Sequence, residues 1–199
     1  MLTFYDDHEL ISREIEKVLR NFAPTAPTEV RSSAFIEELI DSQTNPFSII
    51  PWNTGSIEQV RQSSLRALAR LYPRANRDHQ TQIEKQLIAA SRDANPIVRR
   101  GVAMALKEIE NSDPLPVHLL LPLVVLLHDP DPNTCAWACV ASANLITRGM
   151  ATPFNDHLLE RLLNLADTSP IVQVRVGAAI GLRLVGQSNL LDRETTQRS

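Results

Sequence analysis

A short turn followed by the start of a helix recurs along this chain at nearly constant spacing. Such turns begin at Asp93, Asp129 and Asp167, and a looser copy lies near Ser56. Equivalent positions just after the turns are separated by 38, 36 and 40 residues: Val60, Val98, Thr134 and Val174. A period of about 40 residues is typical of stacked two-helix units, none of which can bury its apolar face alone.

The residues after each marker form a helical stripe. Offsets of 4, 8 and 11 fall on one helix face, and the position at 11 is apolar every time: Leu71, Ile109, Leu145 and Val185. Leu- and Ile-rich runs upstream predict partner helices at 78–90, 115–127 and 154–166. The low aromatic content of 5% and the 6 glycines also favour helices over a sandwich or barrel.

We therefore predict a single all-α domain over residues 1–188, followed by a flexible tail at 189–199. A helix at 6–21 carries one apolar face and would cap the N-terminal end. The predicted helix pairs lie at 30–72, 77–110, 114–148 and 154–186. In the first pair, the helices at 30–43 and 56–72 are joined by an unusually long linker, 44–55.

The segments Pro96–Leu106 and Pro170–Leu182 resemble the turn and second helix of HEAT repeats, in the armadillo-like class. Their sequence pattern is similar to that of the short bacterial repeats of E/F-type phycobilin lyases. The resemblance implies a right-handed α-solenoid of about four HEAT-like helix pairs. It also implies a ladder of Asp–Arg pairs between adjacent repeats, in which Asp93 precedes Arg99 and Asp167 precedes Arg175.

The charge pattern argues against several partners. The net charge is −3, so no global basic field exists to hold nucleic acid or an anionic membrane. The charge is uneven, at −5 over 1–55, +4 over 56–110 and −2 over 111–199. The longest apolar run, Leu115–Leu127, is too short to span a membrane and contains two prolines. Without a targeting signal at the N-terminus, we expect a cytoplasmic protein with no membrane insertion.

Catalytic and metal chemistry have no positive support in the sequence. Cys135 and Cys139 lie four residues apart on one predicted helix, and His128 precedes them. A structural zinc site needs four ligands, and Cys139 aligns with the small residues Ala103 and Ala179. We interpret the cysteines as small buried side chains and expect no metal and no cofactor.

The helix face opposite the apolar stripe is the predicted binding surface. Offsets of 2, 6 and 9 from each marker make it basic toward the N-terminal half and apolar toward the C-terminal half. Trp137 stands where the other units have Ser or Gly, and it either fills a gap or anchors a partner. Trp52 in the linker folds back over the groove or contacts a partner. The candidate partner-binding residues are Arg66, Arg70, Arg100, Met104, Lys107, Trp137, Val140, Ile180, Arg183 and Trp52.

The leading functional hypothesis is a non-catalytic scaffold or assembly factor that holds a segment of another protein on its concave face. An acidic and apolar helix or extended peptide would suit that face. The resemblance supplies an alternative, a phycobilin lyase-like subunit or chaperone in bilin attachment or removal, which leaves the question of enzyme activity open. A HEAT-like DNA glycosylase fold is a third possibility, and the net charge fits it poorly.

Overall fold

The computed structural model describes residues 36, 37, 39–41, 43, 56–109 and 115–197, and beyond residue 188 it describes the backbone alone. The predicted capping helix at 6–21, most of the helix at 30–43, and the linker 44–55 with Trp52 lie outside the described residues. The described part of the chain contains helices and no strand, which confirms the all-α prediction.

Seven α-helices and one short 3₁₀ helix make up the described part after residue 55. They are α3 (Ile57–Leu71), η2 (Tyr72–Arg74), α4 (Arg77–Ala90), α5 (Pro96–Glu108), α6 (Val117–Leu126), α7 (Pro132–Thr147), α8 (Asn155–Thr168) and α9 (Val172–Gln197). Helices therefore form at each of the predicted positions from residue 56 onward. The expected end near residue 188 is wrong, since α9 continues to Gln197. No proline or glycine follows Gly186 to interrupt it.

Local side chains start and stop these helices. Ser56 and Gln59 form a reciprocal capping box at the start of α3. The Asn95 side chain accepts a hydrogen bond from the N–H of Ile97 in α5, and the Asp131 side chain accepts one from the N–H of Thr134 in α7; each cap lies directly before a proline in the first turn. Gly149, at φ 68°, ends α7 in the left-handed conformation that glycine adopts without strain. These caps fix where each helix begins and hence which residues align between units.

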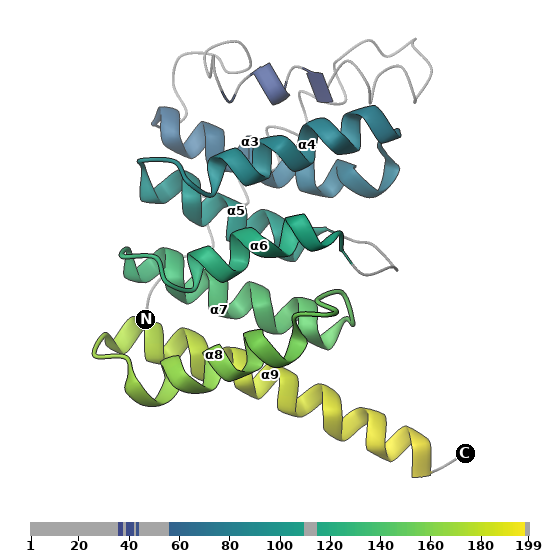
Figure 1. Ribbon diagram of the computed structural model, residues 1–199, viewed down its shortest axis with the longest axis vertical. Helices are drawn as coiled ribbons and strands as arrows, with labels where there is room; N and C mark the ends of the chain where they lie inside the picture. The colour runs from purple at the N-terminus through teal and green to yellow at the C-terminus, as the bar shows by residue number, and fades with distance from the viewer. Residues whose placement is uncertain (1–35, 38, 42, 44–55, 110–114, 198–199) are drawn as a thin grey trace.

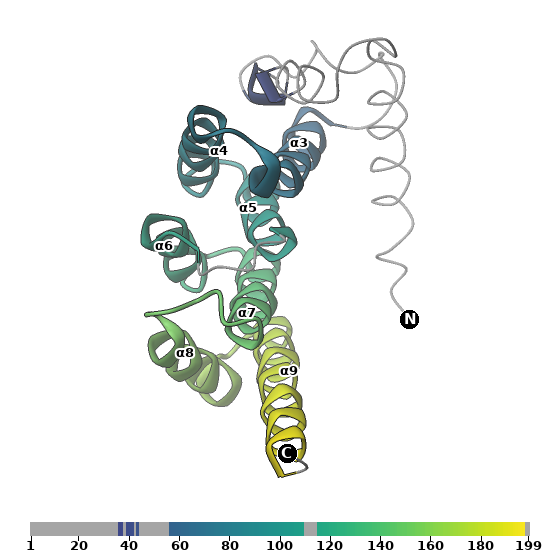
Figure 2. The ribbon, with the colours of Figure 1, turned by 90° about the vertical axis from the view of Figure 1, so that its right-hand side faces the viewer.

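The helices are arranged in two layers (Figures 1 and 2). Helices α3, α5, α7 and α9 contact one another in that order and form what we call the odd layer. Helices α4, α6 and α8 form the even layer, which lies in front in Figure 1 and on the left in Figure 2. Each even helix packs against the odd helix that follows it. The side of the odd layer that points away from the even layer is called here the open face.

The core lies between the two layers. Leu68, Leu106 and Ala138, at the predicted stripe positions, are fully buried, and the even layer contributes Leu87, Leu123 and Leu162. Neighbouring odd helices approach closely through small residues. A Cβ atom added at Gly177 would lie 2.8 Å from the Cα of Ala136, so the main chains of α7 and α9 are almost in contact there.

Candidate functional site

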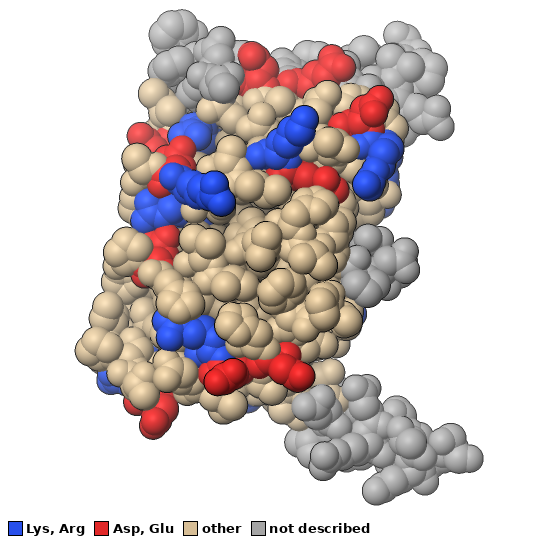
Figure 3. Space-filling model, viewed as in Figure 1, with Lys and Arg blue, Asp and Glu red and all other residues tan. Residues whose placement is uncertain are grey.

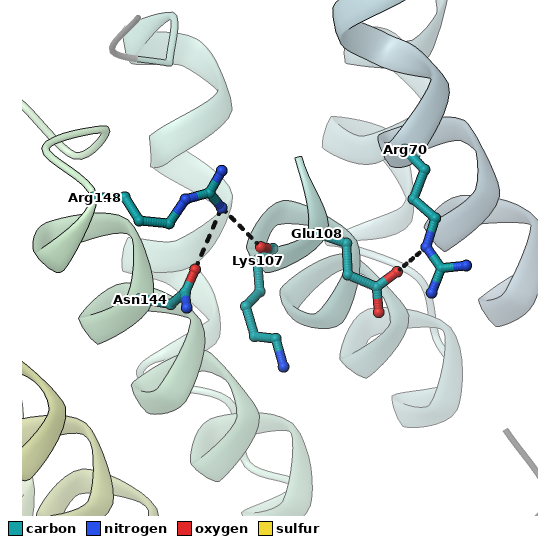
Figure 4. Close-up of a pocket in the computed structure, with 5 residues that line it drawn as sticks. All are labelled: Arg70, Lys107, Glu108, Asn144 and Arg148. Carbon is teal, nitrogen blue, oxygen red and sulfur yellow. Dashed lines mark hydrogen bonds and ion pairs between the residues drawn. The ribbon is translucent and has the colours of Figure 1, made fainter. Parts of the chain in front are cut away.

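A pocket of about 530 Å³ lies at the C-terminal ends of α3, α5 and α7 (Figure 4). Three successive odd helices and the turn after α7 supply its lining. Three of its side chains are basic and one is acidic. The lining residues are Arg70, Lys107, Glu108, Asn144 and Arg148. Arg70 and Lys107 were predicted from the sequence, and the structure brings them together.

Glu108 is held by two arginines of the preceding odd helix. Arg66 Nε donates to Glu108 Oε1 at 2.8 Å, and Arg70 Nε donates to Glu108 Oε2 at 3.0 Å. The side chain of Arg66 is only 13% exposed and that of Glu108 15% exposed, whereas that of Arg70 is 46% exposed. Charge reversal at Arg66 would therefore bury two carboxylates against each other, and we expect it to destabilise the fold.

Two positive charges in the pocket have no carboxylate partner among the described residues. The Lys107 ammonium lies 5.6 Å from the ring centre of Trp137, within the range of a cation–π contact. Arg148 donates to the main-chain oxygens of Lys107 at 3.2 Å and Ile109 at 2.8 Å, which are neutral acceptors. Because Glu108 is already shared by two arginines, the pocket keeps a positive balance that suits an anionic group.

The other predicted binding residues differ in exposure. Met104 is 5% exposed and receives a hydrogen bond from the Gln62 amide at 3.5 Å, so it offers a partner almost no area. Arg100 and Val140 are half-buried, whereas Ile180 and Arg183 on α9 are exposed. The predicted face is therefore interrupted at Met104, where the Gln62 side chain lies against it.

Trp137 lies against the core and is half-buried. The Lys107 ammonium lies over one face of its indole ring. The two alternatives from the sequence, gap filling and anchoring a partner, both stay predictions.

Sequence reasoning missed Glu108, Asn144 and Arg148. Glu108 and Asn144 both lie ten residues after their markers, in the same row as Arg70. The predicted face uses offsets of 2, 6 and 9, and the row at 10 lies beside the position at 6 on the same helix. A polar residue in three of the four units at this offset was the signal that could have revealed the pocket.

Ion pairs connect the turns of neighbouring units, as the predicted ladder requires. Arg61 Nη2 lies 2.7 Å from Asp93 Oδ2. In the next unit, Arg99 donates to both oxygens of Asp129, at 2.6 and 2.8 Å. The hydrogen bonds to Asp129 raise the pKa of Arg99. An arginine thus pairs with the aspartate of the following turn.

The third pair of the ladder, which we call the neutral third rung, has no charged residue. This corrects the prediction that Asp167 belongs to the ladder. The structural equivalent of Asp93 and Asp129, five residues before the marker, is Ser169. Its Oγ accepts from the N–H two residues later, as the Asp93 and Asp129 carboxylates do. The arginine position of the preceding unit is occupied by Cys135. Base and acid are therefore both replaced at the junction of α7 and α9.

The two cysteines are free and buried. The hydrogen bond that the Cys139 thiol donates to Cys135 and the burial of this thiol both raise the pKa of Cys139, so it stays protonated. Cys135 Sγ lies 3.4 Å from the main-chain oxygen of Leu127. In the part of the chain that the structure describes, no group of three or more His, Cys, Asp or Glu side chains could hold a metal ion.

An apolar stripe on the even layer was not predicted. Val117, Leu121 and Val125 recur every four residues on α6, and each is about half exposed, at 48 to 50%. Figure 3 shows a broad uncharged area in the middle of this face, between charged groups above and below it. The sequence predicts a buried helix here, because apolar residues occupy both the core-facing side of α6 and the side that the structure leaves exposed.

No helix among the described residues is long and apolar enough to cross a bilayer. Comparison of the chain with protein-family models, curated proteins and solved structures found no match.

Proposed function

We propose that this protein is a right-handed α-solenoid of HEAT-like helix pairs that acts as a non-catalytic scaffold or assembly factor. Its ligand is an acidic and partly apolar segment of another protein, an amphipathic helix or an extended peptide. The segment lies on the open face, with carboxylates over the pocket at the ends of α3, α5 and α7. Two free, buried cysteines are consistent with a reducing compartment, and we place the protein in the cytoplasm.

The observation that carries the proposal is the unbalanced charge of the pocket. Lys107 and Arg148 face the same space from two successive odd helices, and neither forms an ion pair with a described carboxylate. Glu108 cannot compensate them, because Arg66 and Arg70 already share it. A partner carboxylate that enters the pocket would gain charge-assisted hydrogen bonds without displacing an existing ion pair.

The apolar part of the proposed ligand follows from the C-terminal half of the open face. Val176 and Ile180 on α9 are 51% and 49% exposed, and Val140 on α7 is half-buried. A ligand with acidic residues at one end and apolar residues at the other would match this gradient. Apolar anchors contribute affinity, whereas the charged end contributes association rate and orientation.

The test compares two lysine substitutions with identical chemistry. Lys107→Glu places a negative charge in the pocket, and Lys85→Glu makes the same change on the exposed side of α4 in the even layer. Both variants have the same net charge, so long-range effects cancel. A partner is first isolated with the tagged full chain from native extract and identified by mass spectrometry, and its affinity for each variant is then measured.

We expect Lys107→Glu to weaken binding roughly three- to tenfold at low salt, with a smaller loss at high salt. Lys85→Glu should bind like the parent chain. Circular dichroism of both variants serves as the folding control. Equal affinity of parent and Lys107→Glu at low salt would disprove a role of the pocket in binding.

A further inference from the structure

Helix α6 is apolar on all sides although it lies in the outer layer of the stack. Its residues include no Lys, Arg, Asp or Glu, and His118 is its one polar residue. A helix that is apolar on all sides is ordinarily buried. One side of α6 packs on the core, but Val117, Leu121 and Val125 on the other side are 48 to 50% exposed. A further surface is therefore expected to cover this stripe.

Helices α4 and α8, on either side of α6 in the even layer, differ in the sign of their exposed charge. The exposed charged residues of α4 and of the turn after it are three basic and one acidic: Arg77, Asp78, Lys85 and Arg92. The exposed charged residues of α8 are all acidic: Asp156, Glu160 and Asp167. Figure 3 shows the uncharged area at the level of α6, with charged groups above and below it. The outer face thus changes from basic through apolar to acidic along the stack.

The charges share a helix face with exposed neighbours on each helix. On α8, the exposed residues Asp156, Glu160, Leu163 and Asp167 form one outward row. The same spacing on α4 gives an outward row of exposed residues from Asp78 to Ala89 that includes Lys85. Counted from the start of each row, Lys85 is level with Leu163, one helical turn from Glu160.

A face with this pattern is complementary to itself. A two-fold axis that lies in the interface and runs parallel to α6 places α4 of each copy against α8 of the other. Basic side chains then meet acidic ones on both sides, and the two α6 stripes meet in the middle. A two-fold axis along the stack would instead place α8 against α8, with the carboxylates of the two copies opposed. The charges therefore favour the first arrangement.

We propose that the outer face of the even layer is a homodimer interface, built around the stripe of Val117, Leu121 and Val125 and oriented by the opposite charges of α4 and α8. The opposite charges on the two sides of the stripe indicate a second copy of this chain as its occupant. The pocket lies on odd-layer residues, so dimerisation leaves it accessible. A dimer would present two open faces and could hold two segments of a partner at once.

The test is sedimentation velocity of the full chain between about 1 and 100 µM. Leu121→Glu and Ile180→Glu are a matched pair, because both make the same change at helical side chains that are 49% exposed. Leu121 lies in the proposed interface, and Ile180 lies on α9 in the odd layer. Circular dichroism of each variant serves as the folding control.

We expect the parent chain to dimerise. Leu121→Glu should raise the Kd of the dimer tenfold or more, because the substitution enters a two-fold interface twice, and Ile180→Glu should dimerise like the parent. Glu160→Lys should weaken the dimer about three- to tenfold at low salt, since it places a cation near Lys85 of the other copy. Adding Lys85→Glu to that variant should restore the parent Kd, because the two reversed charges again attract.

Three results would overturn the proposal. One is a parent chain that stays monomeric over the whole concentration range, and another is a dimer that Leu121→Glu leaves intact. The third is a dimer of the Glu160→Lys variant that Lys85→Glu fails to restore, which would show that α4 does not face α8 of the other copy. A monomeric parent chain that Leu121→Glu clearly destabilises in thermal unfolding would identify another part of the same chain as the cover of the stripe.

Discussion

Two glycines on α9 allow the packing of the odd layer to be measured with one type of substitution. A methyl group at Gly177 would lie 2.8 Å from both the Cα and the Cβ of Ala136 and 2.9 Å from its main-chain oxygen. A methyl group at Gly186 would have no atom within 4 Å. Both residues are helical, so Gly→Ala gains about 0.5–1 kcal/mol of helix stability at either position.

Both variants gain the same helix stability from Gly→Ala. The difference between their free energies of unfolding therefore reports the cost of the steric clash at Gly177 alone. Main-chain atoms of α7 cannot move aside like a flexible side chain, and overpacking of this kind costs about 1–3 kcal/mol. Gly186→Ala should therefore melt above the parent chain, and Gly177→Ala should be about 1–3 kcal/mol less stable than Gly186→Ala. In a domain of this size, each kcal/mol shifts Tm by roughly 2–4 °C.

The assay is thermal and urea unfolding of both variants, followed by circular dichroism. A Gly177→Ala variant as stable as Gly186→Ala would refute the close approach of α7 and α9. Equal urea m-values would show that both variants expose the same surface area on unfolding, so that their midpoints can be compared.

Two further substitutions test the core and a buried hydrogen bond. Leu106→Ala should lower the free energy of unfolding by about 2–5 kcal/mol in urea titrations, because Leu106 is fully buried between the layers; an unchanged midpoint would contradict the repeat alignment. Burial and the hydrogen bond to Glu84 raise the pKa of Tyr72 above its ordinary value of 10.0, so its stabilising contribution is present below about pH 10 and declines at higher pH as the unfolded tyrosine ionises. Tyr72→Phe should reduce the loss of stability between about pH 9 and pH 11, and an equally steep loss in both proteins would argue against a raised pKa.

The helices could be predicted from the sequence because their signals are local. A proline in the first turn, a capping Asn or Asp, and an apolar residue every three or four positions act within a single helix. The end of α9 was missed for the same reason. The residues after Ser188 lack an apolar stripe, but they also lack any proline or glycine that would stop a helix, and a missing stripe alone does not end one.

The candidate site was harder to predict because it depends on contacts between helices. Lys107 and Arg70 could be placed on one face by counting offsets, but Glu108 was recognised only when two arginines from the preceding helix were seen to hold it. The register between neighbouring helices, which decides such contacts, is set by the approach of Gly101 to Gln62 and of Gly177 to Ala136. The register between neighbouring helices cannot be predicted from a single sequence.

Because the third rung is neutral, neighbouring units are connected in two different ways, with and without an ion pair between their turns. The turns joined by Arg61–Asp93 and Arg99–Asp129 are held by charges that dissolved salt weakens where they are exposed. Between α7 and α9, Cys135 and Ser169 leave no ladder charge to weaken, and the helices are held by the fit of small side chains. Salt therefore weakens the Arg61–Asp93 pair, the more exposed of the two, before the Arg99–Asp129 pair. At the contact of α7 with α9 it finds no ladder charge to screen.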